Sequence, residues 1–167
     1  RFIKEMEDVL KIQDRGRFKL DMKYFSFPFQ GVSLRWHNCQ PKLATVFSSR
    51  LRDLFGPPRK EDENLTQIHY DIAASLQQIY EKTFFSILNY AYQITRNENL
   101  CLAGGCALNS LANGKIFDHT PFKEVYIQPA SSDAGGALGA ASYLYHQLLG
   151  GEKKFIMEDA YWGPDFN

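Results

Sequence analysis

The sequence predicts an α/β fold, and three observations carry this prediction. Residues 65–95 repeat apolar side chains at helical spacing and contain neither Gly nor Pro. Two short apolar runs, 99–103 and 125–128, each end in a turn of small residues. Each turn leads into another helix-like segment, so the order after residue 64 is helix, strand, helix, strand, helix. Such alternation is typical of helices layered on a parallel sheet.

The composition indicates one globular domain without an excess of either charge. The chain has 167 residues, of which 44% are hydrophobic and 23% charged, and its formal net charge is zero. Residues 1–60 carry a net charge of +7 and residues 61–167 a net charge of −7, so two unlike segments cancel. A nucleic-acid-binding domain is usually strongly basic, and nucleic acid is therefore excluded as an expected partner.

Neither a membrane segment nor a disulfide framework is indicated. The longest uncharged stretch, residues 134–151, contains five glycines and several polar residues, which is typical of a helix outside a membrane. The three cysteines, Cys39, Cys101 and Cys106, are odd in number and lack the C-x-x-C spacing. A reducing, cytoplasmic location is expected.

Residues 1–64 are predicted to be an irregular connector or insertion with little regular sheet. A short amphipathic stretch at 2–12 precedes an aromatic patch at 24–29, and Gly and Pro interrupt the chain at 56–58. The cations of this segment could contact phosphates, but a solvated face is the favoured interpretation; they are Arg50, Arg52, Arg59 and Lys60.

Regular structure is expected from residue 65 onward. Asn64 is predicted to cap the helix at 65–95, with Gln67 completing a capping box. The remaining elements are strands at 99–103 and 125–128 and helices at 107–117 and 134–149. Parallel pairing of the two strands would place both strand-to-helix turns side by side at one sheet edge.

The two turns share a Gly-Gly pair between strand and helix. The first reads LAGGCALN at residues 102–109, and the second reads QPASSDAGGALG at residues 128–139. Glycines allow positive φ and close approach of a ligand, while N–H groups at a helix start favour an anion. Neither turn has the Rossmann or Walker spacing. Glycines can also serve only helix packing, but two consecutive turns of this design favour ligand binding.

Asp133 is the only carboxylate in the second turn. Its chemistry allows either a helix N-cap, which the residue type alone favours, or a hard ligand for a divalent cation. Asn109 is either a tolerated polar residue or a ligand contact. His69 and His146 are expected to be core or surface side chains.

These motifs closely resemble the O-carbamoyltransferase family of nodulation and antibiotic-tailoring enzymes. The resemblance rests first on the two glycine turns with Asp133 between them. It extends upstream, in the family's order, to RFKLD at 17–21, LFGPPR at 54–59 and DIAASLQ at 71–77. Nearly the whole chain is covered.

The resemblance implies part of an actin-like ATPase domain of the ribonuclease H-like class, with residues 65–167 as the C-terminal part of that core. Family members use ATP and carbamoyl phosphate to form a carbamoyl-adenylate, and then carbamoylate a hydroxyl-bearing small molecule. A divalent metal, with iron as the expected ion, would be held in part by Asp133, and a homodimer is compatible with the family. The implied nucleotide-binding residues are Gly104, Gly105, Asn109, Ser132, Gly135 and Gly136.

The chain departs from the family in one respect. The family's metal site also requires two histidines four residues apart on a helix, and no two histidines here have that spacing. The family's separate carbamoyl-phosphate domain is expected to follow AYWGP at 160–164. A fragment of the enzyme is therefore expected, inactive alone. Other actin-like ATPases, such as a sugar kinase or a threonylcarbamoyl transferase, and a non-catalytic nucleotide-binding module are the alternatives.

Overall fold

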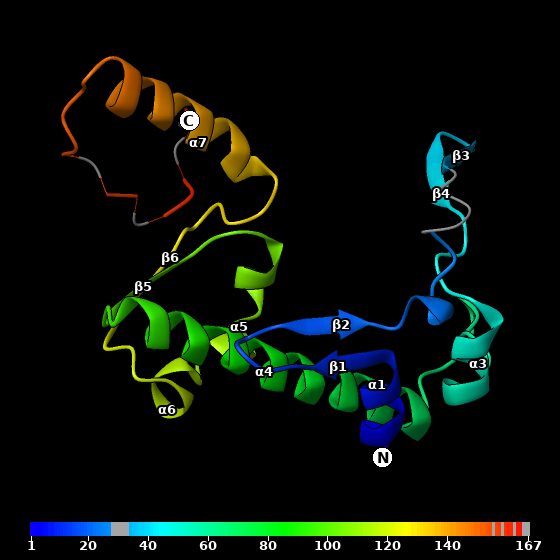
Figure 1. Ribbon diagram of the computed structural model, residues 1–167. Coiled ribbons are helices and arrows are strands. Elements are labelled where there is room, and N and C mark those ends of the chain that lie inside the picture. The colour runs from blue at the N-terminus through cyan, green and yellow to red at the C-terminus, as the bar shows by residue number, and fades with distance from the viewer. Residues whose placement is uncertain (28–33, 155, 158, 162, 165–167) are drawn as a thin grey trace. The chain divides into compact units, whose positions relative to one another are not determined.

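The computed structural model is of mixed α/β class and describes residues 1–27, 34–154, 156, 157, 159–161, 163 and 164 (Figure 1). It divides into two compact units, Arg1–Tyr90 and Ala91–Asn167, with the boundary inside the longest helix. The elements in order are α1 (Ile3–Val9), β1 (Leu10–Ile12), β2 (Phe18–Leu20), η1 (Met22–Tyr24), β3 (Leu34–His37), β4 (Gln40–Leu43), α3 (Ser49–Phe55), α4 (Gln67–Thr95), β5 (Asn99–Leu102), η2 (Gly105–Leu108), α5 (Ser110–Asn113), α6 (Ile116–His119), β6 (Glu124–Ile127), α7 (Ala134–Tyr143) and η3 (Leu144–Leu148).

The first unit contains two β-hairpins, so the expectation of little regular sheet in residues 1–64 was wrong. β1 pairs antiparallel with β2, and β3 pairs antiparallel with β4. Each hairpin turns through two consecutive residues of positive φ, Arg15 and Gly16 in one and Asn38 and Cys39 in the other. The strands are only three or four residues long, and the turns rather than an alternating apolar pattern specify them. The expected aromatic patch is described only in part, because residues 28 and 29 lie outside the described residues.

The first hairpin turn lies directly against α4 (Figure 1). A Cβ at Gly16 would lie 2.9 Å from the Cβ of Tyr90 and 3.1 Å from the Cα of Ile87. Gly16 also has a φ of 63°, which favours glycine. Two separate requirements therefore select glycine here, and the steric one comes from a contact with residues more than seventy positions away in the sequence.

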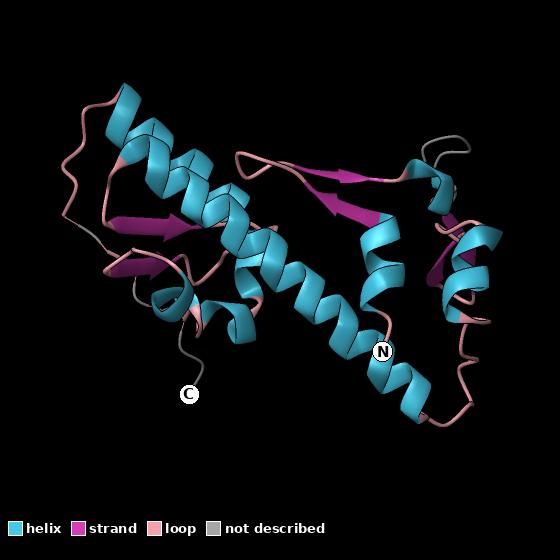
Figure 2. Ribbon diagram, turned by 60° about the horizontal axis from the view of Figure 1, so that its bottom comes forward, coloured by secondary structure: helices cyan, strands magenta, loops and turns pink. Residues whose placement is uncertain are grey.

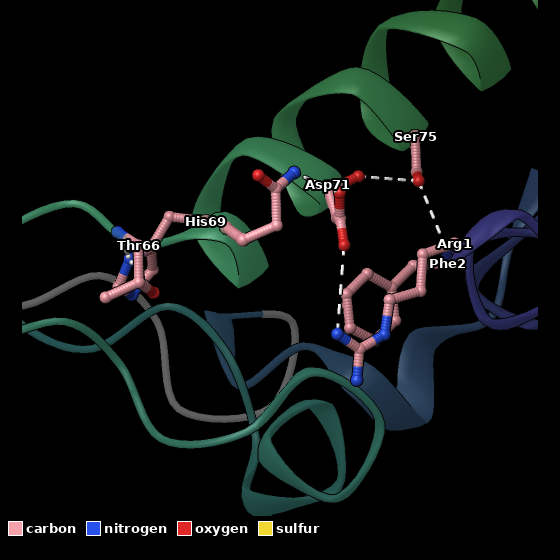
Figure 3. Close-up of polar contacts among 7 residues, drawn as sticks. Arg1, Phe2, Thr66, His69, Asp71 and Ser75 are labelled. Atoms are coloured by element: carbon pink, nitrogen blue, oxygen red, sulfur yellow. Dashed lines mark hydrogen bonds and ion pairs between the residues drawn. The ribbon is translucent and has the colours of Figure 1, made fainter.

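The long helix predicted at 65–95 is confirmed as α4, but its start differs from the expected one. The helix begins at Gln67, and the cap is Thr66 rather than Asn64. The N–H of Thr66 donates to Nδ1 of His69 at 2.9 Å (Figure 3). The imidazole thus takes the place that Glu or Gln has in a capping box, while the side chain of Gln67 donates to Asp71.

The N-terminal segment is attached to α4 through polar and aromatic contacts (Figure 3). The N–H of Phe2 donates to Oγ of Ser75 at 3.1 Å, and that hydroxyl donates to the carbonyl of Asp71. The guanidinium of Arg1 lies 3.8 Å from the Asp71 carboxylate. The buried ring of Phe2 meets Phe55 edge to face, which ties α3 to the same cluster.

The second unit is built on a two-stranded parallel sheet. β5 and β6 confirm both predicted strands, and their register pairs Asn99 with Glu124 and Leu102 with Ile127. At the amino ends, the carbonyl of Glu98 accepts the N–H of Lys123. The ammonium of Lys123 also lies 2.7 Å from the Glu98 carboxylate, and this hydrogen bond raises the pKa of the lysine.

The helix expected at 107–117 is wrong: the segment forms three short turns, η2, α5 and α6. The break after η2 occurs at Asn109, which has a ψ of 86° and accepts the N–H of Ala112 with its side chain. A second break lies at Lys115, whose φ of −104° and ψ of 2° leave the helical region. An Asn that bonds the backbone locally competes with helix continuation.

The last predicted helix, at 134–149, is confirmed as α7 followed by the π-helical turn η3. Neither element has a buried residue. In the part of the chain that the structure describes, no helix combines the length and the apolar character needed to cross a membrane.

Ile116 anchors the core of the second unit and is fully buried. Replacing it by Ala is expected to lower the free energy of unfolding of the complete protein by about 2–5 kcal/mol, because the lost methylene groups leave a cavity. The adjacent Phe117 is 59% exposed, and Phe117→Ala is the matched control, with an expected change within about 0.5 kcal/mol. Thermal unfolding of the two variants measures the difference. Equal losses would show that Ile116 is not a core anchor.

Candidate functional site

The two glycine turns lie side by side, as expected, at the carboxyl edge of the β5–β6 sheet (Figure 2). The N–H of Gln128 donates to the carbonyl of Leu102 at 3.1 Å, which extends the ladder past the strands. The N–H of Gly104 then donates to the carbonyl of Ser131 at 2.6 Å. One turn is therefore hydrogen-bonded to the other, and a ligand at this edge would meet both.

Gly104 is the conformational centre of the first turn. Its φ of 94° lies in the region that favours glycine, and no atom outside its neighbours lies within 4 Å of a Cβ built there. Backbone conformation, and not crowding, selects this glycine. Gly105 opens η2, and a Cβ there would make ordinary contact with Oγ of Ser132 at 4.0 Å. Both glycines are exposed, so their backbone remains accessible to a ligand.

The second turn is held by side chains that the sequence did not single out. Oε1 of Gln128 accepts the N–H of Ala130 at 2.8 Å. The hydroxyl of Ser131, a residue only 5% exposed, donates to the carbonyl of Gln128. The available signal was a Gln-Pro-x-Ser run, because polar side chains around proline commonly close turns on the backbone.

Gly135 and Gly136 differ in whether their positions leave room for a side chain. A Cβ at Gly135 would overlap the carbonyl oxygen of Ala130, whereas a Cβ at Gly136 would find nothing within 4 Å. The N–H of Gly135 donates to the carbonyl of Ser132, and that of Gly136 to the carbonyl of Asp133. Gly135 thus lets α7 start close beneath the turn, and Gly136 presents an open surface at the helix start.

Asp133 occupies the N-cap position of α7 without capping it. Its φ of −56° and ψ of −34° are helical, and its side chain makes no capping hydrogen bond. The residue is exposed, and its carboxylate forms no hydrogen bond or ion pair with any described residue. Of the two roles that its chemistry allows, the cap is not formed, and the carboxylate is available to a ligand.

Asn109 and Ser132 lie beside the same turns. Asn109 is half-buried, and its Oδ1 accepts the N–H of Ala112 at 3.1 Å, so part of its side chain serves as the cap of α5. Ser132 is exposed, and its carbonyl accepts the N–H of Gly135. All six residues predicted to bind nucleotide therefore lie in the paired turns, with Asn109 as the last residue of the first turn. Their role in binding stays a prediction.

The side chains at the two turns supply one ligand of a metal site, and that ligand is Asp133. Asp133 offers a hard oxygen ligand of the kind that divalent cations bind. Within the described residues, however, no three His, Cys, Asp or Glu side chains lie together where they could hold a metal ion. A cation at Asp133 would need its other ligands from beyond these residues or from bound phosphates. Asp133 as a metal ligand stays a prediction.

Comparison with known proteins decides the family. The family described as "Carbamoyltransferase N-terminus" matches residues 3–142, which include both glycine turns. The chain belongs to the carbamoyltransferase family. The match begins in α1 and continues into α7, so it covers parts of both units of this carbamoyltransferase chain.

Individual relatives are similar over the same region. "Uncharacterized protein sll1178" of Synechocystis sp. is 40% identical over 166 residues, which cover 96% of this chain and 25% of that protein. "Nodulation protein NolNO" of Sinorhizobium fredii is 39% identical over 107 residues, or 64% of this chain and 16% of that protein. "Uncharacterized protein MJ1058" of Methanocaldococcus jannaschii is 38% identical over 99 residues, or 58% and 16%. The carbamoyltransferase chain thus spans a quarter or less of these relatives.

Proposed function

We propose that the complete protein is an ATP-dependent carbamoyltransferase and that the paired turns of this chain contact its nucleotide. One observation carries the proposal: two Gly-Gly turns are hydrogen-bonded to each other at one sheet edge, and the carboxylate of Asp133, between the two Gly-Gly pairs in sequence, has no partner among the described residues. The family match adds the reaction class. An actin-like ATPase core is proposed as the larger fold to which the β5–β6 sheet belongs, and the cytoplasm as its location.

The proposed reaction proceeds in two stages, formation of carbamoyl-adenylate and transfer of the carbamoyl group. Water releases inorganic phosphate from carbamoyl phosphate, and the resulting carbamate oxygen attacks the α-phosphorus of ATP, which expels pyrophosphate and leaves carbamoyl-adenylate. The hydroxyl oxygen of a small-molecule acceptor then attacks the carbamoyl carbon. The bond to AMP breaks, AMP leaves, and the hydroxyl proton passes to a base.

The residues of this chain would serve binding and orientation. Exposed backbone at Gly104, Gly105 and Gly136 can approach phosphates closely, and N–H groups at the start of α7 favour their negative charge. Asp133 would hold a divalent metal, with iron as the proposed ion. When bound, such an ion neutralises charge that develops on phosphate oxygens.

The decisive experiment is formation of carbamoyl-adenylate by the complete protein. With carbamoyl phosphate, ATP and Fe²⁺, the expected products before any acceptor is added are carbamoyl-adenylate, pyrophosphate and phosphate, separated by chromatography. Omission of carbamoyl phosphate should stop pyrophosphate release, which distinguishes this activity from an unrelated ATPase or a sugar kinase. Preformed threonylcarbamoyl-adenylate should not serve as a donor; if the protein transfers its threonylcarbamoyl group to an acceptor with release of AMP, the protein is a threonylcarbamoyl transferase instead.

Residues 1–167 alone are expected to yield no carbamoyl-adenylate under the same conditions. The described residues contain no complete metal-binding cluster, and this observation favours a nucleotide-binding module without catalysis for the isolated chain. The same assay tests both proteins in parallel. Turnover by the isolated chain at the rate of the complete protein would show that the chemistry does not depend on the rest of the polypeptide.

A further inference from the structure

An apolar pocket of about 380 Å³ lies in the first unit, formed entirely by residues of that unit. Its walls come from α1, α3 and α4, from the bridged residues Phe25 and Phe47, and from the loop at 56–59. The size matches that of pockets that enclose small organic molecules, about 300–1,000 Å³. The main apolar contributors are Met6, Val9, Leu51, Phe55, Ile72 and Leu76.

The loop wall of this pocket is conformationally restricted. Gly56 ends α3 with a φ of 88°, and the two prolines that follow restrict the backbone further. The guanidinium of Arg59 donates to the carbonyls of Glu61 and Glu63, and the N–H of Lys60 donates to the Glu63 carboxylate at 3.1 Å. A wall held in this way loses little further entropy when a ligand binds.

The polar groups on the pocket are donors and cations. Arg52 lines it with its guanidinium 5.8 Å from the centre of the Phe47 ring, and this arginine has no carboxylate partner among the described residues. Nδ1 of His69 accepts the N–H of Thr66, so a neutral His69 carries its proton on Nε2 and remains a donor. No Asp or Glu is among the described residues that line the pocket. The charged residues of this lining, Arg52 and Arg59, are both cations, which complements an anion.

We propose that this pocket is a binding site for an anionic amphiphile, a small molecule with an aromatic or acyl body and one carboxylate or similar acid group. The body occupies the apolar walls, and the acid group pairs with Arg52. The proposal does not depend on the paired glycine turns, since it concerns other residues in the other unit.

The test measures binding of 2-naphthoate and of its uncharged analogue 2-naphthalenemethanol to the complete protein by titration calorimetry. Naphthoate is expected to bind saturably at one site, about threefold to tenfold more tightly than the alcohol, since one charge-assisted contact is added. Arg52→Gln should remove that difference and leave binding of the alcohol unchanged. Arg50→Gln is the matched control, because Arg50 is on α3, exposed and not part of the pocket, and it should retain the difference.

Location is tested by Ile72→Trp, which should fill the pocket and abolish binding of both probes, with circular dichroism to verify the fold. Naphthoate binding by a folded Ile72→Trp protein would overturn the assignment. Equal affinities for the two probes, or an unchanged ratio in Arg52→Gln, would overturn the role of charge. Binding to residues 1–167 but not to the complete protein would mean that another part of the polypeptide covers the pocket, which also overturns the proposal.

Discussion

Asp133→Ala in the complete protein is expected to reduce carbamoyl-adenylate formation by about 100-fold or more, because a metal ligand that supports phosphate charge contributes several kcal/mol to the barrier. The fold should be nearly unaffected. The carboxylate is exposed and makes no capping hydrogen bond, so its removal breaks no described contact. A residue that serves structure alone would give the opposite pattern, with lower stability and unchanged rate.

Two measurements separate these outcomes. The initial rate of pyrophosphate release gives the effect on activity, and thermal unfolding without nucleotide gives the effect on stability. Asp118→Ala is the matched control, since Asp118 is an exposed carboxylate on α6 and loses the same charge. Bound iron, measured by elemental analysis after gel filtration, should fall for the Asp133 variant only. Wild-type rate and iron content in that variant would reject the metal role.

Gly135→Ala is expected to destabilise the complete protein by about 1–3 kcal/mol, the range typical of an overpacked site. The added methyl group would overlap the carbonyl oxygen of Ala130, which is backbone and cannot rotate away. The second turn would have to move, and nucleotide affinity should fall with it. Gly136→Ala adds the same atom one residue later, where nothing lies within 4 Å, and is expected to be neutral or up to about 1 kcal/mol stabilising.

The comparison of these two alanine variants requires only thermal unfolding and nucleotide titration. Gly135→Ala should lower both the unfolding midpoint and the affinity, and Gly136→Ala should preserve the midpoint or raise it slightly. If Gly136→Ala lowers affinity at full stability, its open surface is a direct nucleotide contact. Equal midpoints for the two variants would show that the close approach at Ala130 does not constrain the turn.

The long helix α4 and most of the second unit could be predicted because their signals are local. The spacing of apolar residues identified α4, and the short apolar runs before Gly-Gly identified β5 and β6. Parallel pairing then placed the two turns together, since parallel strands end at the same edge. The helix expected at 107–117 failed at Asn109, whose side chain bonds to Ala112 and competes with the helical backbone.

The hairpins and the pocket could not be predicted because their determinants are distant in sequence. Gly16 must be small because Tyr90 lies against it. Phe2 is buried because its N–H donates to Ser75 and its ring packs against Phe55. The start of α4 was misplaced by two residues for a different and local reason, since the imidazole of His69 replaced the expected amide in the cap.

The sequence by itself determined the α/β class, the order of elements after residue 64 and the two glycine turns, because periodicity and turn chemistry are written in neighbouring residues. Only the tertiary structure decided that the side chain of Asp133 does not cap α7, that Gly135 and not Gly136 is sterically required, and that residues of the first unit form an open apolar pocket. These three properties depend on which atoms lie nearby in space, and side chains and carbonyl groups reach those positions only when the chain has folded.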